Sequence, residues 1–455
     1  MKLRTIAVAA AALLVTACGG GSAVSPALPG EKPPTSQAFP SRGVARGLSS
    51  GKIKHVVIIV QENRSFNNLF YGFPGARTVK YGYDSSNQRI RLKPIGFDTH
   101  WDLGHSSAAY FDACDGTGSI PGTNCRMNGF DKEYAGCGPC PIPHPQYAYV
   151  PQSETKPYFD IGKQYVLADE MFASNFDASS FVSHQYIIAG QAESAVDFPW
   201  NAWGCPGGPS DDVETIGPQR QIPSGYEVAC WDPTTLGDEL DSAGLSWGFY
   251  TSQWDTSAGI WSAYQAIDHI YNGPDWSKDV ITPQTRFFDD VSKGKLRAVN
   301  WVTPTWPNSD HAGSASNTGP SWVAQLVNAI GESKYWDSTA IFIFWDDYGG
   351  WYDPQAPKYV DYDGLGLRIP MLVVSAYAKA GHVSHVHYEH GSILKFVEDT
   401  FGLARLAASD KRAKSPARDA FDFSQAPRKF VPIQSPYDRT YFLQQPLDQH
   451  IPDAE

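Results

Sequence analysis

The stretch Lys54-His55-Val56-Val57-Ile58-Ile59-Val60 decides the fold of this 455-residue chain. A continuous run of mostly β-branched residues is typical of a strand that is buried on both faces of a parallel sheet. The polar segment Gln61-Glu62-Asn63-Arg64 follows directly, so we expect it to lie where that strand ends.

Further strand-like runs lie at Leu296 to Thr303, Ile341 to Trp345 and Met371 to Ser375, and helical patterns lie at Ser321 to Ile330 and Ser392 to Phe401. Strands that alternate with helices predict an α/β fold with a mainly parallel sheet. The segment from about Lys80 to Pro157 has little periodicity and holds four cysteines. We therefore expect a disulfide-rich excursion from the sheet that covers a functional site.

The N-terminus carries a targeting pattern. Lys2 and Arg4 precede the apolar run Ile6 to Ala17, which is too short to span a bilayer but fits a signal peptide. The run ends in Leu14-Val15-Thr16-Ala17-Cys18-Gly19, which resembles a bacterial lipobox with a lipidated cysteine. A plain signal peptide before a chance cysteine is the alternative.

These features predict three parts of the chain. We expect a lipoprotein signal peptide over residues 1–18, a flexible Gly/Ser/Pro-rich tether over 19–50 and a single domain over 51–455. Such a protein would be exported, and either periplasmic, anchored in the outer membrane through its N-terminal lipid, or secreted. The net charge of −12 and the lack of a dense Lys/Arg run argue against a nucleic-acid partner.

The cysteine count also indicates export. Of the seven cysteines, removal of Cys18 leaves six, namely Cys114, Cys125, Cys137, Cys140, Cys205 and Cys230. An even number in an oxidising compartment predicts three disulfides, whose pairing stays open. The spacing Cys137-Gly138-Pro139-Cys140 also occurs in metal sites, but no second pair accompanies it.

Two polar pairs, Glu62-Asn63 and Asp346-Asp347, each follow a predicted strand. In α/β sheets ligands bind beyond the carboxyl ends of the strands, and oxygen-rich side chains there suit a hard cation. A cation would also relieve the repulsion between neighbouring acids. The alternative for an isolated Asp-Asp pair is a loop cap beside a solvated side chain. The second pair favours a site for one divalent metal ion, with Ca, Mg, Mn or Zn all open.

Ser180 is the candidate nucleophile. It lies in the stretch Asn175 to Tyr186, where it opens a helical pattern, and a helix N-terminus favours both an alkoxide and an anionic phosphate. Taken alone, a serine at such a position is more often a helix cap. Ser179 is adjacent, so the two serines could exchange these roles.

Several histidines could serve the same site. His311 follows the strand that ends near Thr303, where it could hold a phosphoryl oxygen or protonate a leaving group. His105, with His100, could reach in from the excursion. A histidine-rich run fits either transition-metal binding or a chance cluster, and it comprises His382, His385, His387 and His390.

Together these motifs resemble the bacterial phosphoesterase family that holds phospholipases C and metal-dependent acid phosphatases. The matching segments are Gln61 to Gly72, Arg126 to Phe130, Ser180, His311, Asp346 to Asp353 and Val383 to His385. Two positions depart from the family pattern: Asn67 stands where relatives usually have Asp, and Pro354 stands where many have His.

The resemblance implies an alkaline-phosphatase-like three-layer α/β sandwich with one metal. It also implies a role for each matching residue: Glu62, Asn63, Asp346 and Asp347 as metal ligands, Ser180 as the nucleophile, and His311, with His105 and His385 around it, as contacts to phosphate or the leaving group.

The predicted function is metal-dependent hydrolysis of phosphate esters through a phosphoseryl intermediate. We expect an acid phosphatase acting on monoesters, because larger phospholipase relatives carry an extra C-terminal module, for which we expect this chain to be too short. A phospholipase C acting on phospholipid headgroups is the first alternative. The second is a catalytically inactive surface lipoprotein whose acid pairs hold a structural Ca²⁺.

Overall fold

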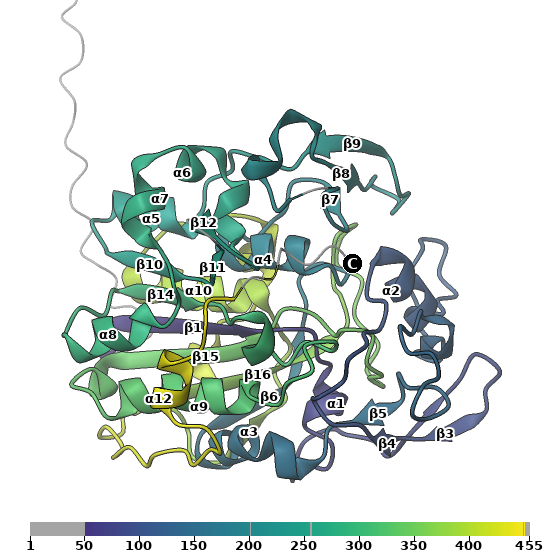
Figure 1. Ribbon diagram of the computed structural model, residues 1–455, viewed down its shortest axis with the longest axis horizontal. Coiled ribbons are helices and arrows are strands. Elements are labelled where there is room, and N and C mark those ends of the chain that lie inside the picture. Colours follow the sequence, from purple (N-terminus) through teal and green to yellow (C-terminus); the bar gives the residue numbers. More distant parts are fainter. Residues whose placement is uncertain (1–50, 201, 255–256, 449, 451–455) are drawn as a thin grey trace, which may run out of the picture. The chain divides into compact units, whose positions relative to one another are not determined.

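Figure 1 shows the computed structural model, which describes residues 51–200, 202–254, 257–448 and 450. The predicted signal peptide and tether therefore lie outside the described residues. Among the helices of the described part, none combines the length and the apolar character that a membrane span requires.

A nine-stranded sheet forms the centre of the domain, in the order β13-β10-β14-β1-β15-β16-β6-β17, with β18 also paired to β6. The strands are β1 (His55–Gln61), β6 (Val166–Phe172), β10 (Trp247–Tyr250), β13 (Val280–Ile281), β14 (Val299–Val302), β15 (Thr339–Trp345), β16 (Arg368–Ser375), β17 (His382–Ser384) and β18 (Tyr388–Glu389). Only the two pairings made by β16 are antiparallel. The predicted α/β fold with a mainly parallel sheet is confirmed.

Strand β1 lies at the heart of this sheet. Residues 56–60 are completely buried, as the unbroken apolar run predicted. The strand pairs in parallel with β14 on one side and β15 on the other, in a register that sets Gln61 opposite Trp345. The residues that follow these two strands, Glu62 and Asp346, therefore emerge side by side.

Helices cover both faces of the sheet. Helix α9 (Gly319–Gly331) contacts α3 (Gln152–Gln164) and α8 (Arg286–Ser292), and α4 (Ser180–Ala189) contacts α5 (Leu236–Ser242) and α10 (His390–Phe401). In Figure 1, α3 and α9 lie in the lower half of the domain and α4 and α5 in the upper half. The two predicted helices fall within α9 and α10, so those predictions are confirmed.

The remaining elements are short. They are α1 (Phe66–Leu69), α2 (Ser107–Cys114), α6 (Asp268–Tyr271), α7 (Pro274–Asp279), α11 (Ala408–Arg412), α12 (Arg439–Leu443), β2 (Tyr81–Tyr83), β3 (Arg89–Arg91), β4 (Lys93–Pro94), β5 (Ala148–Tyr149), β7 (Ala195–Val196), β8 (Asp212–Thr215), β9 (Gly225–Val228), β11 (Gln253–Trp254) and β12 (Ser257–Ala258). The elements α2 and β2 to β5 make up the predicted excursion, at the right of Figure 1.

Three disulfides join the six cysteines, as predicted. Cys114–Cys125 and Cys137–Cys140 lie within the excursion, whereas Cys205–Cys230 closes a later loop. Cys137 and Cys140 therefore bond to each other, which excludes the metal-binding alternative for this pair in its oxidised form.

A buried ion pair fixes the far end of the acidic motif. Arg368 Nε lies 2.9 Å from Asp353 Oδ1, Arg368 Nη2 lies 3.0 Å from Asp353 Oδ2, and neither side chain is exposed. Asp353 also accepts from the backbone N–H of Asn67 at 3.0 Å. The Asp353 carboxylate thus connects the loop after β15 to the loop after β1.

We predict that Arg368→Ala lowers the free energy of unfolding by about 3–5 kcal/mol, because it leaves the Asp353 carboxylate buried without its counter-ion. Urea denaturation would measure the change. Lys156→Ala is the control, since its ion pair with Asp160 lies at the surface and should contribute about 1 kcal/mol at most. Equal losses in the two variants would contradict the prediction.

Candidate active site

The ends of β1 and β15 bring the two predicted polar pairs together. The Asp346 N–H donates to Gln61 O at 3.0 Å, and the Asn63 N–H donates to Asp346 Oδ1 at 3.1 Å. Asn63 adopts a left-handed backbone conformation, with φ of 53°. This turn directs its side chain back over the end of the strand. Glu62, Asn63, Asp346 and Asp347 are all 0% exposed.

The Asn63 amide lies at the centre of this cluster. Its Oδ1 is 3.1 Å from Glu62 Oε2 and 3.2 Å from Asp346 Oδ1. The Ser180 hydroxyl donates to the same oxygen at 3.4 Å. One amide oxygen is thus surrounded by two carboxylate oxygens and a hydroxyl.

Two histidines face the other end of the amide. Asn63 Nδ2 lies 2.8 Å from His105 Nε2 and 3.1 Å from His311 Nε2. His105 Nδ1 donates to Leu103 O at 2.7 Å, and His311 Nδ1 donates to Ala312 O. Because a neutral imidazole carries one proton, each ring offers an Nε2 lone pair that accepts from the amide NH₂.

These contacts decide which way the amide points. With Nδ2 toward the histidines, Oδ1 faces carboxylate oxygens, an arrangement of acceptors that becomes favourable only with a cation between them. The reversed amide would satisfy the carboxylates but would require both buried imidazoles to hold a second proton. Oxygens about 3 Å apart also match ligands at about 2.1 Å from Mg²⁺. The donor set therefore fits a divalent cation that prefers oxygen.

The second acidic pair is held by a tight turn. Asp347 Oδ1 accepts from the Gly349 N–H at 2.7 Å, while Asp346 Oδ2 is buried and accepts no hydrogen bond from the described residues. Gly349 has φ of +59°, and a Cβ there would come within 2.1 Å of Asn63 O. Glycine is required at this position because the backbone of Asn63 passes so close.

The two adjacent serines take different positions. Ser179 is the N-cap of α4, where its hydroxyl accepts from the Val182 N–H and donates to Asp177 Oδ2. Ser180 is the first helical residue, and its hydroxyl faces Asn63. Of the two, only the Ser180 hydroxyl contacts the polar cluster among the described residues.

His184 joins the cluster although the sequence did not single it out. Its Nε2 lies 2.9 Å from Glu62 Oε1 and 3.9 Å from Asp346 Oδ2. Burial lowers the pKa of His184 to about 4, so the ring is neutral at ordinary pH. The available signal was its spacing from Ser180, because residues four apart share one face of a helix.

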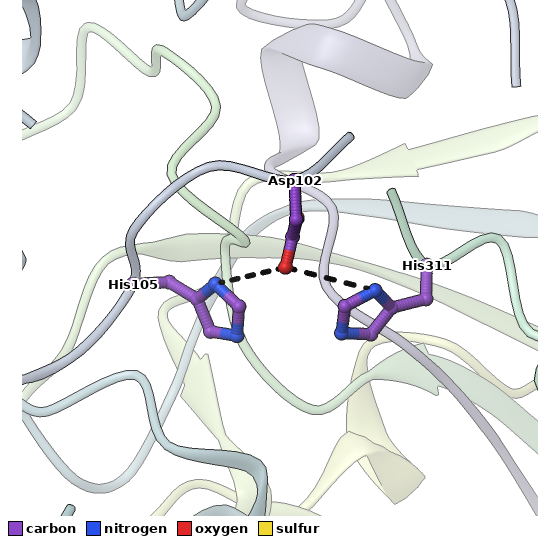
Figure 2. Close-up of side chains that lie close together, drawn as sticks. All are labelled: Asp102, His105 and His311. Atoms are coloured by element: carbon purple, nitrogen blue, oxygen red, sulfur yellow. Dashed lines mark ion pairs between the residues drawn. The ribbon is translucent and has the colours of Figure 1, made fainter. Parts of the chain in front are cut away.

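Asp102 is the second residue that the sequence did not single out. Figure 2 shows its carboxylate between His105 and His311, with Oδ2 3.9 Å from each Nδ1 atom. Both Nδ1 atoms already donate to backbone carbonyls, which disfavours a metal ion at this position. A carboxylate at this distance stabilises positive charge that develops on either ring.

The histidine-rich run does not form a cluster in the described part of the chain. His385 is about half exposed and hydrogen-bonds Asp169 at 2.8 Å, away from Asn63. His382 pairs with Asp419, and His387 stacks on Phe172. His100, in the excursion, is exposed. Of the predicted histidines, the structure brings His105 and His311 to Asn63. His390, buried at the start of α10, lies close enough to Asp346 and His184 for their charges to act on its pKa, which burial lowers to about 4.

We predict that Asp177 makes stability depend on pH. Burial, followed by the charge of Asp197, raises the pKa of Asp177 to about 8, well above the value of about 3.9 in an unfolded chain. The folded state therefore holds an extra proton, whose stabilising effect is lost as the pH rises toward 8. The melting temperature should fall less steeply between pH 6.5 and 8 in Asp177→Asn than in the wild type.

The interval from pH 6.5 to 8 is chosen because it lies above the lowered pKa of the buried histidines. Asp98→Asn removes an exposed carboxyl and should leave the slope unchanged. Identical slopes for the wild type and Asp177→Asn would disprove the assignment.

Comparison with known proteins finds a matching family and several similar proteins. A family model described as the phosphoesterase family matches residues 53–404. A non-hemolytic phospholipase C of Burkholderia pseudomallei is 24% identical over 403 residues, covering 77% of this chain and 55% of that protein. Phospholipase C B of Mycobacterium tuberculosis is 24% identical over 436 residues, covering 84% of this chain and 80% of that protein. The chain thus spans only about half of the Burkholderia relative.

Among solved structures, a protein of the alkaline phosphatase superfamily from Vibrio parahaemolyticus is similar at a TM-score of 0.38 and 10% identity. The match covers 79% of this chain and 69% of that protein. A likeness this distant carries no argument about the site.

Proposed function

Since the chain belongs to the phosphoesterase family, we propose that it hydrolyses phosphate esters at the cluster around Asn63, with Ser180 as the nucleophile. The observation that carries the proposal is the convergence of Glu62, Asp346 and Ser180 oxygens on one amide oxygen. Glu62, Asn63, Asp346 and Asp347 would hold one divalent cation. When bound, that cation would lower the pKa of the Ser180 hydroxyl and neutralise phosphoryl oxygens.

In the proposed reaction, Ser180 Oγ attacks phosphorus and the bond from phosphorus to the leaving oxygen breaks, giving a phosphoseryl enzyme. Water then attacks the phosphorus of this intermediate and the bond to Ser180 Oγ breaks, which releases inorganic phosphate from a monoester or a phosphomonoester from a diester. Ser180 opens α4, whose N-terminus favours the anionic phosphoryl group. His311 and His105, through their Nε2 atoms, would hold a phosphoryl oxygen or protonate the leaving oxygen. His385 hydrogen-bonds Asp169 and is given no part in this reaction.

We propose a phospholipid or related diester as the first substrate class to test, because the relatives named above are phospholipases C. The sequence favoured a phosphomonoester, and neither the described residues nor these relatives support that preference. For the location, the three disulfides support an oxidising compartment, and the N-terminal pattern supports a lipid anchor in the membrane.

The two serines give a matched test of the nucleophile. We expect Ser180→Ala to lower turnover by at least about 10³-fold with little change in melting temperature, because it removes the attacking oxygen. Ser179→Ala should keep activity but lose about 0.5–2 kcal/mol of stability, because it removes a helix cap. Release of p-nitrophenol and thermal melting would measure both. An active Ser180→Ala variant would exclude the proposed nucleophile.

The substrate class can be decided with two chromogenic esters. We expect the purified protein to cleave p-nitrophenylphosphorylcholine faster than p-nitrophenyl phosphate, and EDTA to abolish both reactions. Faster cleavage of the monoester would restore the acid-phosphatase prediction. No cleavage of either ester with Ca²⁺, Mg²⁺, Mn²⁺ or Zn²⁺, together with a lower melting temperature in EDTA, would favour a metal-stabilised binding lipoprotein instead.

A further inference from the structure

The two oxygens of the Glu62 carboxylate contact different residues. Oε1 lies 2.9 Å from His184 Nε2, whereas Oε2 lies 3.1 Å from Asn63 Oδ1. Glu62 is 0% exposed and His184 is 1% exposed. One oxygen is therefore held by an imidazole while the other is turned toward the proposed cation.

The direction of this contact identifies what His184 does. An ionised carboxylate only accepts hydrogen bonds, so His184 Nε2 carries the proton and donates it to Glu62 Oε1. A nitrogen that donates a proton has no lone pair for a metal. His184 therefore acts on the metal through Glu62 and not as a ligand.

The place of His184 in the fold adds a second consequence. His184 follows Ser180 by four residues on α4, so both side chains lie on the helix face that meets the strand ends. The Trp203 ring packs edge-on against the imidazole, with centroids 5.6 Å apart. This packing restricts the orientation of the ring, and the bond to Glu62 ties the helix that carries Ser180 to the end of β1.

We propose that His184 is a positioning residue that fixes the Glu62 carboxylate so that Oε2 faces the cation. The inference rests on the proposed metal site. Without the imidazole donor, Glu62 Oε1 would lose its 2.9 Å hydrogen bond, and the carboxylate would be held less firmly in this orientation. The metal would then lose a prepared ligand, which for such supporting contacts costs about 10–100-fold in affinity.

Calorimetric titration of the metal-free protein with Mn²⁺ at pH 8 tests this directly. We expect His184→Leu, which fills the space but has no donor, to bind Mn²⁺ about 10–100-fold more weakly than the wild type. His184→Gln keeps an N–H donor at similar reach and should recover most of the affinity. The side chain in His184→Asn is too short to reach Glu62, so this variant should bind Mn²⁺ as weakly as His184→Leu. Because asparagine is polar, the variant removes the contact without burying an additional apolar group.

His387→Gln is the matched control. It makes the same substitution at a histidine that stacks on Phe172, outside the cluster, and should leave Mn²⁺ affinity unchanged. Wild-type affinity in both His184→Leu and His184→Asn would overturn the inference while leaving the metal site intact. Failure of the wild type itself to bind Mn²⁺ would overturn the metal site and this inference together.

Electron spin-echo spectroscopy of the Mn²⁺ complex separates positioning from ligation. We expect no nitrogen coupling that depends on residue 184. A ¹⁴N coupling present in the wild type and lost in His184→Leu would make His184 a direct ligand and would overturn the positioning role.

Discussion

The parallel pairing of β1 with β15 is the constraint on which the site depends. The register that sets Gln61 opposite Trp345 delivers Glu62 and Asp346 to one buried position at the same edge of the sheet. Carboxylates buried this close are stable only when a cation or several donors offset their charges. The position of the Asn63 amide, between carboxylate oxygens on one side and two histidine Nε2 atoms on the other, supplies the physical argument for a cation. The position of the acids therefore depends on the buried apolar residues of β1, because the pairing of this strand in the sheet holds the acids in place.

The two histidines beside Asn63 are brought to this edge by segments distant in sequence. His105 comes from the excursion, where Leu103 forms an isolated β-bridge with Ala135, just before the Cys137–Cys140 disulfide. His311 comes from the loop after β14, which the buried Arg64 guanidinium holds by donating to a backbone carbonyl of that loop at 2.7 Å. The disulfides and the buried arginine thus stabilise loops that ordinary helix or strand contacts would leave free to move.

Sequence alone predicted the elements whose pattern is local and strong. The strands at β1 and β15 and the helices α9 and α10 were recognised because long apolar runs and helical periodicity need no tertiary information. Strand β6 was missed because Asp169 and Glu170 interrupt its apolar run; Asp169 is buried only because tertiary partners bind its carboxylate. The acidic pairs were found from their place after strands. The place of Asp102 beside the histidines and the hydrogen bond from His184 to Glu62 could not be predicted from the sequence, because each depends on the packing of separate segments.

The two departures from the family pattern have structural explanations. The Asn67 amide accepts from the Val79 N–H at 2.8 Å and donates to Val79 O at 3.4 Å, and its backbone binds Asp353. An aspartate at position 67 would keep the first of these bonds but could not donate the second, and it would add a negative charge near the buried Asp353. Pro354 follows Asp353, whose carboxylate forms the buried ion pair with Arg368. Both positions therefore lie in the loops behind the polar cluster, and the cluster around Asn63 is assembled without a side chain from either.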